Sequence, residues 1–247
     1  MKIHFKPTLW GTFALLVFCS LFIALGLWQL DRGRQKHEIY QQYLQRSELP
    51  AIDLNQTLTH STDMNGRKAT AKGHYLTSSP QVLLDNQIYK GRVGYSVLTP
   101  FKLDDNHLII WVHRGWIPMP AGDRSKIPDI SEELTHPSLE GILISAPTTG
   151  ITLEKTPIES LTPQILRVQT FDLVQLTQKT GLVTLPSMLK LVGGTQGPFV
   201  QEWQSPGSGE QKHYGYAFQW FSFAILAIII YLVTAIRRPK QDASVKT

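Results

Sequence analysis

The sequence of 247 residues has a single cysteine, Cys19, so it holds neither a disulfide framework nor a cysteine-rich metal site. It also lacks a surplus of charge in its central part, because residues 31–215 carry 18 acidic and 18 basic side chains. The formal net charge of +5 therefore belongs to the two ends of the chain. Nucleic-acid binding needs a basic face on a folded domain, so this charge distribution argues against nucleic acid as a partner.

The motifs of common catalytic sites are missing as well. The glycine-rich segment at residues 193–198 has no Lys-Ser or Lys-Thr pair, which a phosphate-binding loop requires. Residues 207–209 do not have the spacing of a nucleophile elbow. His107 and His113 would lie ~20 Å apart on one strand, too far to share a metal ion. We therefore expect a protein that is not an enzyme.

Two long apolar runs stand near the ends of the chain. Residues 7–30 and 214–236 contain no Asp, Glu, Lys or Arg. At ~1.5 Å rise per residue each run reaches ~35 Å, enough to cross a hydrocarbon core of ~30 Å. We expect transmembrane helices over residues 9–30 and 216–236. For the first run the alternative is a signal peptide cleaved near residues 24–26, although the run is longer than the usual ~7–15 apolar residues.

Basic residues predict the orientation of these spans. Arg237 and Arg238 directly follow the second span, with Lys240 close by, whereas only Lys212 precedes it. The positive-inside rule then makes the C-terminus cytoplasmic, and two spans place both tails on the same side. We expect a multi-pass protein of a bacterial inner membrane, or of the mitochondrial inner membrane with the matrix as the inner side. The expected parts are tails at 1–8 and 237–247 inside and residues 31–215 in the periplasm or intermembrane space.

Between the spans, the pattern predicts a helical stem and then a β-rich domain. Residues 31–46 lack proline and carry apolar residues at helical spacing, and Pro50 ends this stretch. Asp172 as N-cap and Gly181 as terminator predict one short helix over residues 173–179. Short runs rich in Val, Ile, Thr and aromatics predict strands at 68–75, 81–85, 93–99, 107–113, 139–144 and 188–192. The expected fold class is a membrane protein in which two transmembrane helices flank a mainly antiparallel, barrel- or sandwich-like α+β domain.

Polar and aromatic side chains form two stripes at the outer ends of the spans, where both helices meet the same membrane surface. The stripes consist of Trp28, Gln29 and Arg32 on the first helix and His213, Tyr216 and Trp220 on the second. Such a set suits haem, since an imidazole can ligate the iron, a guanidinium can pair with a propionate and rings can pack on the macrocycle. The alternative is that His213 and Arg32 reach the lipid headgroups while the tryptophans anchor the helices.

Ordered motifs over nearly the whole chain resemble the surfeit locus protein 1 family. They are residues 25–32 with Lys36, Leu84-Asp85-Asn86, Gly91, Gly94-Tyr95, Arg114-Gly115-Trp116, residues 213–217 and Trp220-Phe221. The chain departs from the family at Gln87 and His113, where Arg and Asn are usual.

The residues themselves also allow a structural interpretation of these motifs. Asp85-Asn86 indicates a turn between strands, and Gly91 and Gly94 indicate turns or bulges. The triplet at residues 114–116 indicates a strand end that turns over a packed tryptophan.

The resemblance implies an assembly factor for haem–copper cytochrome c oxidase that aids the entry of haem a into subunit I. It maps the family's proposed haem ligand onto His213, so that haem a would be the cofactor and His213 the ligand of its iron. The implied partners are oxidase subunit I and the lipid bilayer, with haem a synthase as a further candidate. One alternative is a scaffold that holds nascent subunit I without binding haem. A haem-modifying enzyme fits least, because no acid–base or redox constellation was found.

Overall fold

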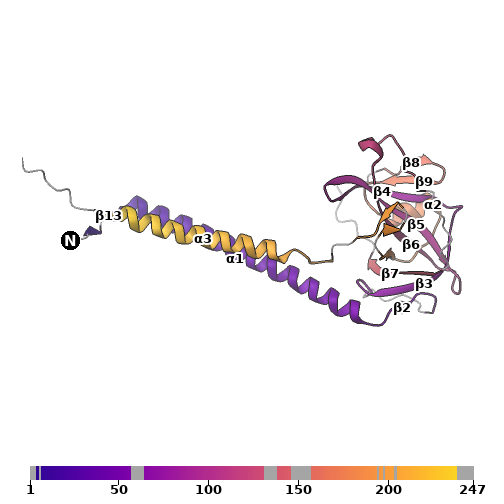
Figure 1. Ribbon diagram of the computed structural model, residues 1–247, viewed down its shortest axis with the longest axis horizontal. Helices are drawn as coiled ribbons and strands as arrows, with labels where there is room; N and C mark the ends of the chain where they lie inside the picture. The colour runs from indigo at the N-terminus through magenta and orange to yellow at the C-terminus, as the bar shows by residue number, and fades with distance from the viewer. Residues whose placement is uncertain are drawn as a thin grey trace, which may run out of the picture. The chain divides into compact units, whose positions relative to one another are not determined.

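The computed structural model describes residues 4–5, 7–56, 64–130, 138–145, 157–193, 195–196, 198–202 and 205–237 (Figure 1). The chain divides into two compact units, residues 1–42 with 205–247 and residues 43–204. Lys2, Lys6, Arg238 and Lys240, on which the predicted orientation depends, lie outside the described residues.

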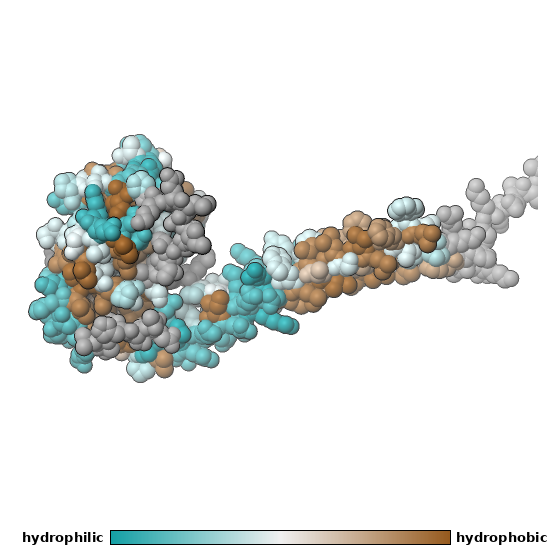
Figure 2. All heavy atoms as spheres, turned by 180° about the vertical axis from the view of Figure 1, so that it is seen from behind, coloured by the Kyte–Doolittle hydropathy of each residue, from teal (hydrophilic) through white to brown (hydrophobic). Residues whose placement is uncertain are grey.

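The first unit is a pair of long helices that run side by side (Figure 1). Helix α1 (Leu9–Glu48) contains the first apolar run and continues without a break into the expected stem, and α3 (Glu210–Ala235) contains the second run. Both helices are long and apolar enough to cross a membrane. Figure 2 shows apolar residues over most of the pair and hydrophilic residues toward the stem. Strands β1 (His4–Phe5) and β13 (Ile236–Arg237) pair where α1 begins and α3 ends.

The second unit contains a β-sheet that closes on itself. Its strands are β2 (Ile52–Asp53), β3 (Lys68–Tyr75), β4 (Gln81–Tyr89), β5 (Arg92–Leu103), β6 (Ile109–Pro118), β7 (Ser138–Ser145), β8 (Glu159–Thr162), β9 (Ile165–Val168), β10 (Ser187–Leu191), β11 (Thr195–Gln196) and β12 (Phe199–Val200). Neighbouring strands follow the order β6-β10-β7-β3-β5, and β5 also pairs with β6, which completes a five-stranded barrel. The predicted barrel-like architecture with two flanking helices is confirmed.

The long strand β5 belongs to two parts of the sheet. Its first half pairs with β4 and its second half with β3, while β6 follows the other edge over most of its length. From β4 the sheet continues through β9 to β8, outside the barrel. Most pairings are antiparallel, as predicted, and the exceptions in the described chain are β6–β10, β4–β9 and β2–β3.

Apolar side chains fill the barrel and the layer beside it. Inside the barrel, residues such as Phe101, Ile110 and Leu189 are fully buried. A second cluster packs helix α2 (Leu173–Thr180) through Leu176 against Trp111 and neighbouring residues. The predicted ends of α2 are confirmed, because the Asp172 carboxylate accepts backbone N–H bonds at 2.9 and 3.2 Å and Gly181 is left-handed at φ 73°.

Two motif predictions need correction. Asp85 and Asn86 do not form a turn between strands, because β4 continues to Tyr89 and carries a bulge between Leu84 and Gln87, with Asn86 at φ 57°. A buried carboxylate favours this bulge, since Asp85 Oδ1 accepts the N–H of Asn86 at 2.8 Å.

The triplet at residues 114–116 lies within β6 and not at its end, because the strand runs on to Pro118. Gly115, at φ 141°, forms a bulge opposite Val97 and Leu98. Gly91 does form a turn, at φ 77° between β4 and β5. Gly94 lies within β5 and pairs with Gln87 at the β4 bulge, and a Cβ there would collide with the carbonyl oxygen of Ile117.

Candidate functional site

The two long helices pack closely because α1 has glycines where α3 has large rings. Gly26 and Gly33 are buried, and a Cβ on Gly26 would lie 2.6 Å from Cε1 of Phe221. A Cβ on Gly33 would lie 2.6 Å from Cε1 of Tyr214. Small residues of this kind let helices approach in a membrane, where lipid removes the hydrophobic drive for association.

A seven-residue repeat sets the register of the helix pair. Thr12, Cys19, Gly26 and Gly33 recur at this interval on α1, and Thr12 Oγ1 lies 2.8 Å from the Tyr231 hydroxyl. The Cys19 thiol lies 3.7 Å from the carbonyl oxygen of Ala224. A sustained seven-residue spacing keeps one seam of each helix toward its neighbour. These contacts were missed from the sequence, although the repeat of small residues in α1 was a usable signal.

This register brings together two of the predicted site residues, Gln29 and His213. The Nδ1 atom of His213 lies 2.8 Å from Oε1 of Gln29. The amide oxygen is an acceptor, so this contact assigns the proton to Nδ1 and leaves the Nε2 lone pair available to a ligand. His213 is only partly exposed, so the imidazole sits at the margin of the helix pair.

The other predicted residues of α1 form their own pair. The Arg32 guanidinium lies 6.0 Å from the centre of the Trp28 ring, and its Nη1 donates to Oε1 of Gln35 at 2.9 Å. Trp28 is half exposed and Arg32 is exposed. On α3, Tyr216 is also half exposed. These three side chains are therefore accessible from outside the helix pair.

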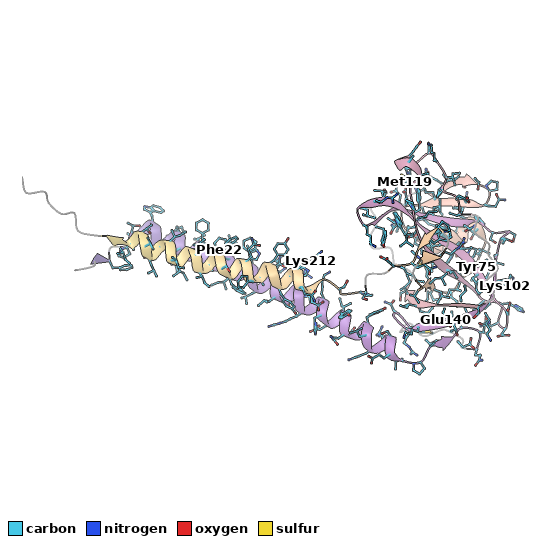
Figure 3. All side chains as sticks on the ribbon, viewed as in Figure 1. Phe22, Tyr75, Lys102, Met119, Glu140 and Lys212 are labelled. Carbon is cyan, nitrogen blue, oxygen red and sulfur yellow. The ribbon has the colours of Figure 1, made fainter. Side chains whose placement is uncertain are left out.

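Trp220 lies deeper in the helix pair than His213. The seven residues between them correspond to ~10 Å along the helix axis. Its ring stacks on Phe22 of α1 with centroids 5.9 Å apart and packs on Phe223 at 5.8 Å. Figure 3 shows Phe22 within the helix pair and Lys212 toward its polar end. Trp220 therefore belongs to an aromatic cluster and not to the immediate surroundings of His213.

In the strand-rich domain, Asp85 takes part in an ion-pair network. Asp85 is almost fully buried and accepts a bond from Arg124 Nε at 2.8 Å. Arg124 also reaches Glu159 at 2.7 Å, and Arg167 binds the other oxygen of Glu159. The Arg167 guanidinium, followed by that of Arg124, lowers the pKa of the Glu159 carboxyl by hydrogen bonding to it. The network joins the β4 bulge to β8 and β9, which gives Asp85 a structural role.

The remaining motif residues of the domain are packed into its core. Arg114 is buried, with its guanidinium 4.3 Å from the centre of the Phe199 ring and 5.8 Å from that of Tyr75. Trp116 donates its Nε1–H to the carbonyl of Gln87 at 2.8 Å. Tyr95 is fully buried. These side chains stabilise the domain and do not present a surface to haem.

Metal-binding clusters are not found in the part of the chain that the structure describes. Among the described residues no group of three or more His, Cys, Asp or Glu side chains could hold a metal ion. The Gln29–His213 contact therefore remains the most informative feature of the predicted site.

Comparison with known proteins identifies relatives along most of the chain. A sequence model of the SURF1 family matches residues 16–225. A SURF1-like protein of Rickettsia bellii is 24% identical over 234 residues, which cover 88% of each chain. An uncharacterized SURF1-like protein of Mycobacterium tuberculosis is 25% identical over 234 residues, 89% of this chain and 81% of the relative. A SURF1-like protein of Dictyostelium discoideum is 28% identical over 127 residues, 48% of this chain and 46% of the relative.

Proposed function

Because the chain belongs to the SURF1 family, we propose that it is an assembly factor for haem–copper cytochrome c oxidase that binds haem a at His213 and aids its insertion into subunit I. Family membership implies the role in oxidase assembly. The observation that carries the haem step is the contact between His213 Nδ1 and the side chain of Gln29.

The chemistry of this contact suits a histidine that would bind the iron of haem. Histidines that bind metals through one nitrogen commonly donate the other N–H to an oxygen acceptor, which fixes the tautomer and the ring orientation. Gln29 supplies that acceptor at 2.8 Å, and Nε2 is the nitrogen that would face the iron. Arg32 would pair with a propionate from the polar side. When bound, haem a would supply the redox centre that the oxidase needs, and this chain would only hold and orient it.

Location and partners follow from the same proposal. The helix pair would be inserted in the bacterial or mitochondrial inner membrane, with residues 31–215 in the periplasm or intermembrane space and both ends on the opposite side. Subunit I is the proposed receiver of haem a, and haem a synthase is the proposed donor. The neutral charge balance of residues 31–215 supports a protein or lipid environment rather than nucleic acid.

The haem content of the purified protein tests the proposal. The full chain is expressed in cells that make haem a, purified in detergent and examined by its absorption spectrum. We expect bound haem a in the wild type and loss of nearly all of it in His213→Ala, which has no nitrogen for the iron. Gln29→Leu should keep the ligand but lose the acceptor that orients it, which weakens metal affinity by ~10–100-fold. His37→Ala is the matched control, since His37 also lies on this helix pair and contacts Glu210 at 3.4 Å.

Two results would contradict the haem step. Unchanged haem a in His213→Ala would remove this residue from the site. A wild-type protein that carries no haem but co-purifies with subunit I would identify a haem-independent scaffold instead.

A further inference from the structure

An aromatic cluster lies toward the membrane interior from the Gln29–His213 contact. Phe18 stacks on Phe22 with ring centroids 6.0 Å apart, and Phe22 stacks on Trp220 at 5.9 Å. Phe223 completes the cluster, with its ring centre 5.8 Å from those of both Phe22 and Trp220. Both helices therefore contribute to one continuous aromatic surface.

The aromatic cluster occupies the same face of the helix pair as the Gln29–His213 contact. Phe22 precedes Gln29 by seven residues, and Trp220 follows His213 by seven residues. Seven residues are close to two full helical turns, so each ring lies nearly below its polar counterpart, ~10 Å further into the helix pair. Arg32 lies on the opposite, polar side of Gln29 along α1.

Neither interfacial anchoring nor helix packing accounts for all of these rings. Aromatic belts gather at the membrane–water boundary, whereas Trp220 and Phe22 lie ~10 Å inward from His213 and Gln29. Phe18 is 51% exposed and Phe223 is 37% exposed, so both present ring surface to the surroundings. Beyond Phe223, the exposed large side chains of α3 are aliphatic, for example Ile225 and Ile229.

We propose that Phe18, Phe22, Trp220 and Phe223 form a binding site for the farnesyl chain of a farnesylated haem. This inference rests on the proposed haem ligation by His213. Haem a carries its farnesyl substituent on the side of the macrocycle away from the propionates. The helix pair presents matching groups in the same order from its polar end inward. They are Arg32 for the propionates, His213 with Gln29 for the iron, and the aromatic cluster for the farnesyl chain. The isoprenoid chain is apolar and presents double bonds and methyl groups, which pack on flat aromatic surfaces.

The site would select haem a, or its farnesylated precursor haem o, over haem b, which has no such chain. Haem b can satisfy the imidazole and the guanidinium as well as haem a does. Selection therefore depends on the aromatic cluster, whereas ligation depends on His213. This separation of roles makes the two proposals independently testable.

Paired titrations of the full-length protein in detergent provide the test, with haem a extracted from oxidase and with haem b. We expect wild-type protein to bind haem a more tightly than haem b. The double variant Phe18→Leu/Phe223→Leu removes the exposed rings while keeping apolar side chains of good helix propensity. The dissociation constant for haem b divided by that for haem a measures the selectivity. Each lost ring is expected to reduce this ratio by about 3- to 10-fold, with the affinity for haem b unchanged.

Phe218→Leu is the matched control, because this phenylalanine of α3 is 76% exposed and lies outside the cluster. It should leave the ratio at the wild-type value, while His213→Ala should weaken both haems. Equal affinity of the wild type for haem a and haem b would overturn the farnesyl site and leave His213 ligation standing. An unchanged ratio in the double variant would overturn it too. Failure of the wild type to bind either haem would overturn both proposals.

Discussion

At the scale of single residues, His113 is a histidine whose buried surroundings disfavour its protonated form. It lies on β6 beside Lys190 of β10, its register partner in the parallel pair. Burial, reinforced by the positive charge of Lys190, lowers the pKa of His113 to about 3. Among the described residues, no group accepts or donates a hydrogen bond at its buried Nδ1. His113 is therefore neutral in the folded protein at physiological pH.

This buried imidazole predicts a loss of stability in mild acid. The unfolded chain protonates His113 near pH 6.5, whereas the folded protein resists protonation until about pH 3. Below pH 6.5 the unfolded state therefore binds more protons than the folded state. Because of His113, the free energy of unfolding falls by about 1.4 kcal/mol for each unit by which the pH is lowered. Lys190, whose pKa burial lowers to about 8, adds no slope in this range.

Urea unfolding of the detergent-solubilised protein between pH 4.5 and 7.5, followed by tryptophan fluorescence, measures the effect. Between pH 6.5 and 4.5 the free energy of unfolding should fall by roughly 2–3 kcal/mol less in His113→Asn than in the wild type. His107→Asn, at an exposed histidine, is the control and should keep the wild-type slope. Equal slopes in wild type and His113→Asn would show that His113 is not held neutral.

Residue-level partners were the least predictable part of the structure. Asp85 could be recognised from the sequence as a motif residue, but its ion-pair partner Arg124 lies 39 residues further along the chain. Glu159 and Arg167, which extend the network through Arg124, lie further still. Only the tertiary fold brings them together. In contrast, the Asp172 cap and the Gly181 terminator of α2 act within a few residues, and both were predicted correctly.

At the scale of elements, the sequence predicted six strands of the domain but missed β8 and β9, and it did not predict how the strands pair. Alternation and β-branched residues mark β3, β4, β5 and β6 locally. Closure of the barrel depends on β5, a strand of 12 residues that pairs first with β4 and then with β3. It also depends on a bulge in the pairing of β5 with β6. A bulge shifts the register by one residue and bends the strand, which no local pattern records.

The close packing of α1 on α3 gives an element-scale prediction. In Gly26→Leu the added side chain meets the Phe221 ring and forces the helices apart, and overpacking of this kind costs ~1–3 kcal/mol. The measurement uses Ala224→Cys, which adds a thiol where the native Cys19 approaches. Oxidative cross-linking between the two positions should fall when Gly26→Leu is added.

Gly215→Leu is the matched control for this experiment. Gly215 lies in α3, the partner helix, and a Cβ there meets no atom within 4 Å. It should leave the cross-linked fraction unchanged. Equal cross-linking in Gly26→Leu would mean that Gly26 does not set the distance between the helices.

At the scale of the whole molecule, the apolar core and the proposed haem ligand lie in different units. All three apolar clusters consist of residues between 54 and 199, so the domain of residues 43–204 contains its whole described core. The proposed ligand His213 and its partner Gln29 both lie in the helical unit. Length and hydropathy predict two apolar helices and a β-rich part between them, because a membrane span needs a long uncharged run and a β domain needs short alternating ones.

This division predicts that residues 43–204, expressed alone, fold and bind no haem. The buried Trp111 and Trp116 should give a near-ultraviolet circular dichroism signal that is lost in one cooperative thermal transition. Haem a added to this fragment should give no spectrum of a ligated haem, whereas the full chain should. Haem binding by the fragment with the affinity of the full chain would place the site in the barrel and contradict ligation by His213. A fragment without a cooperative transition would show instead that the barrel depends on the helical unit for its stability.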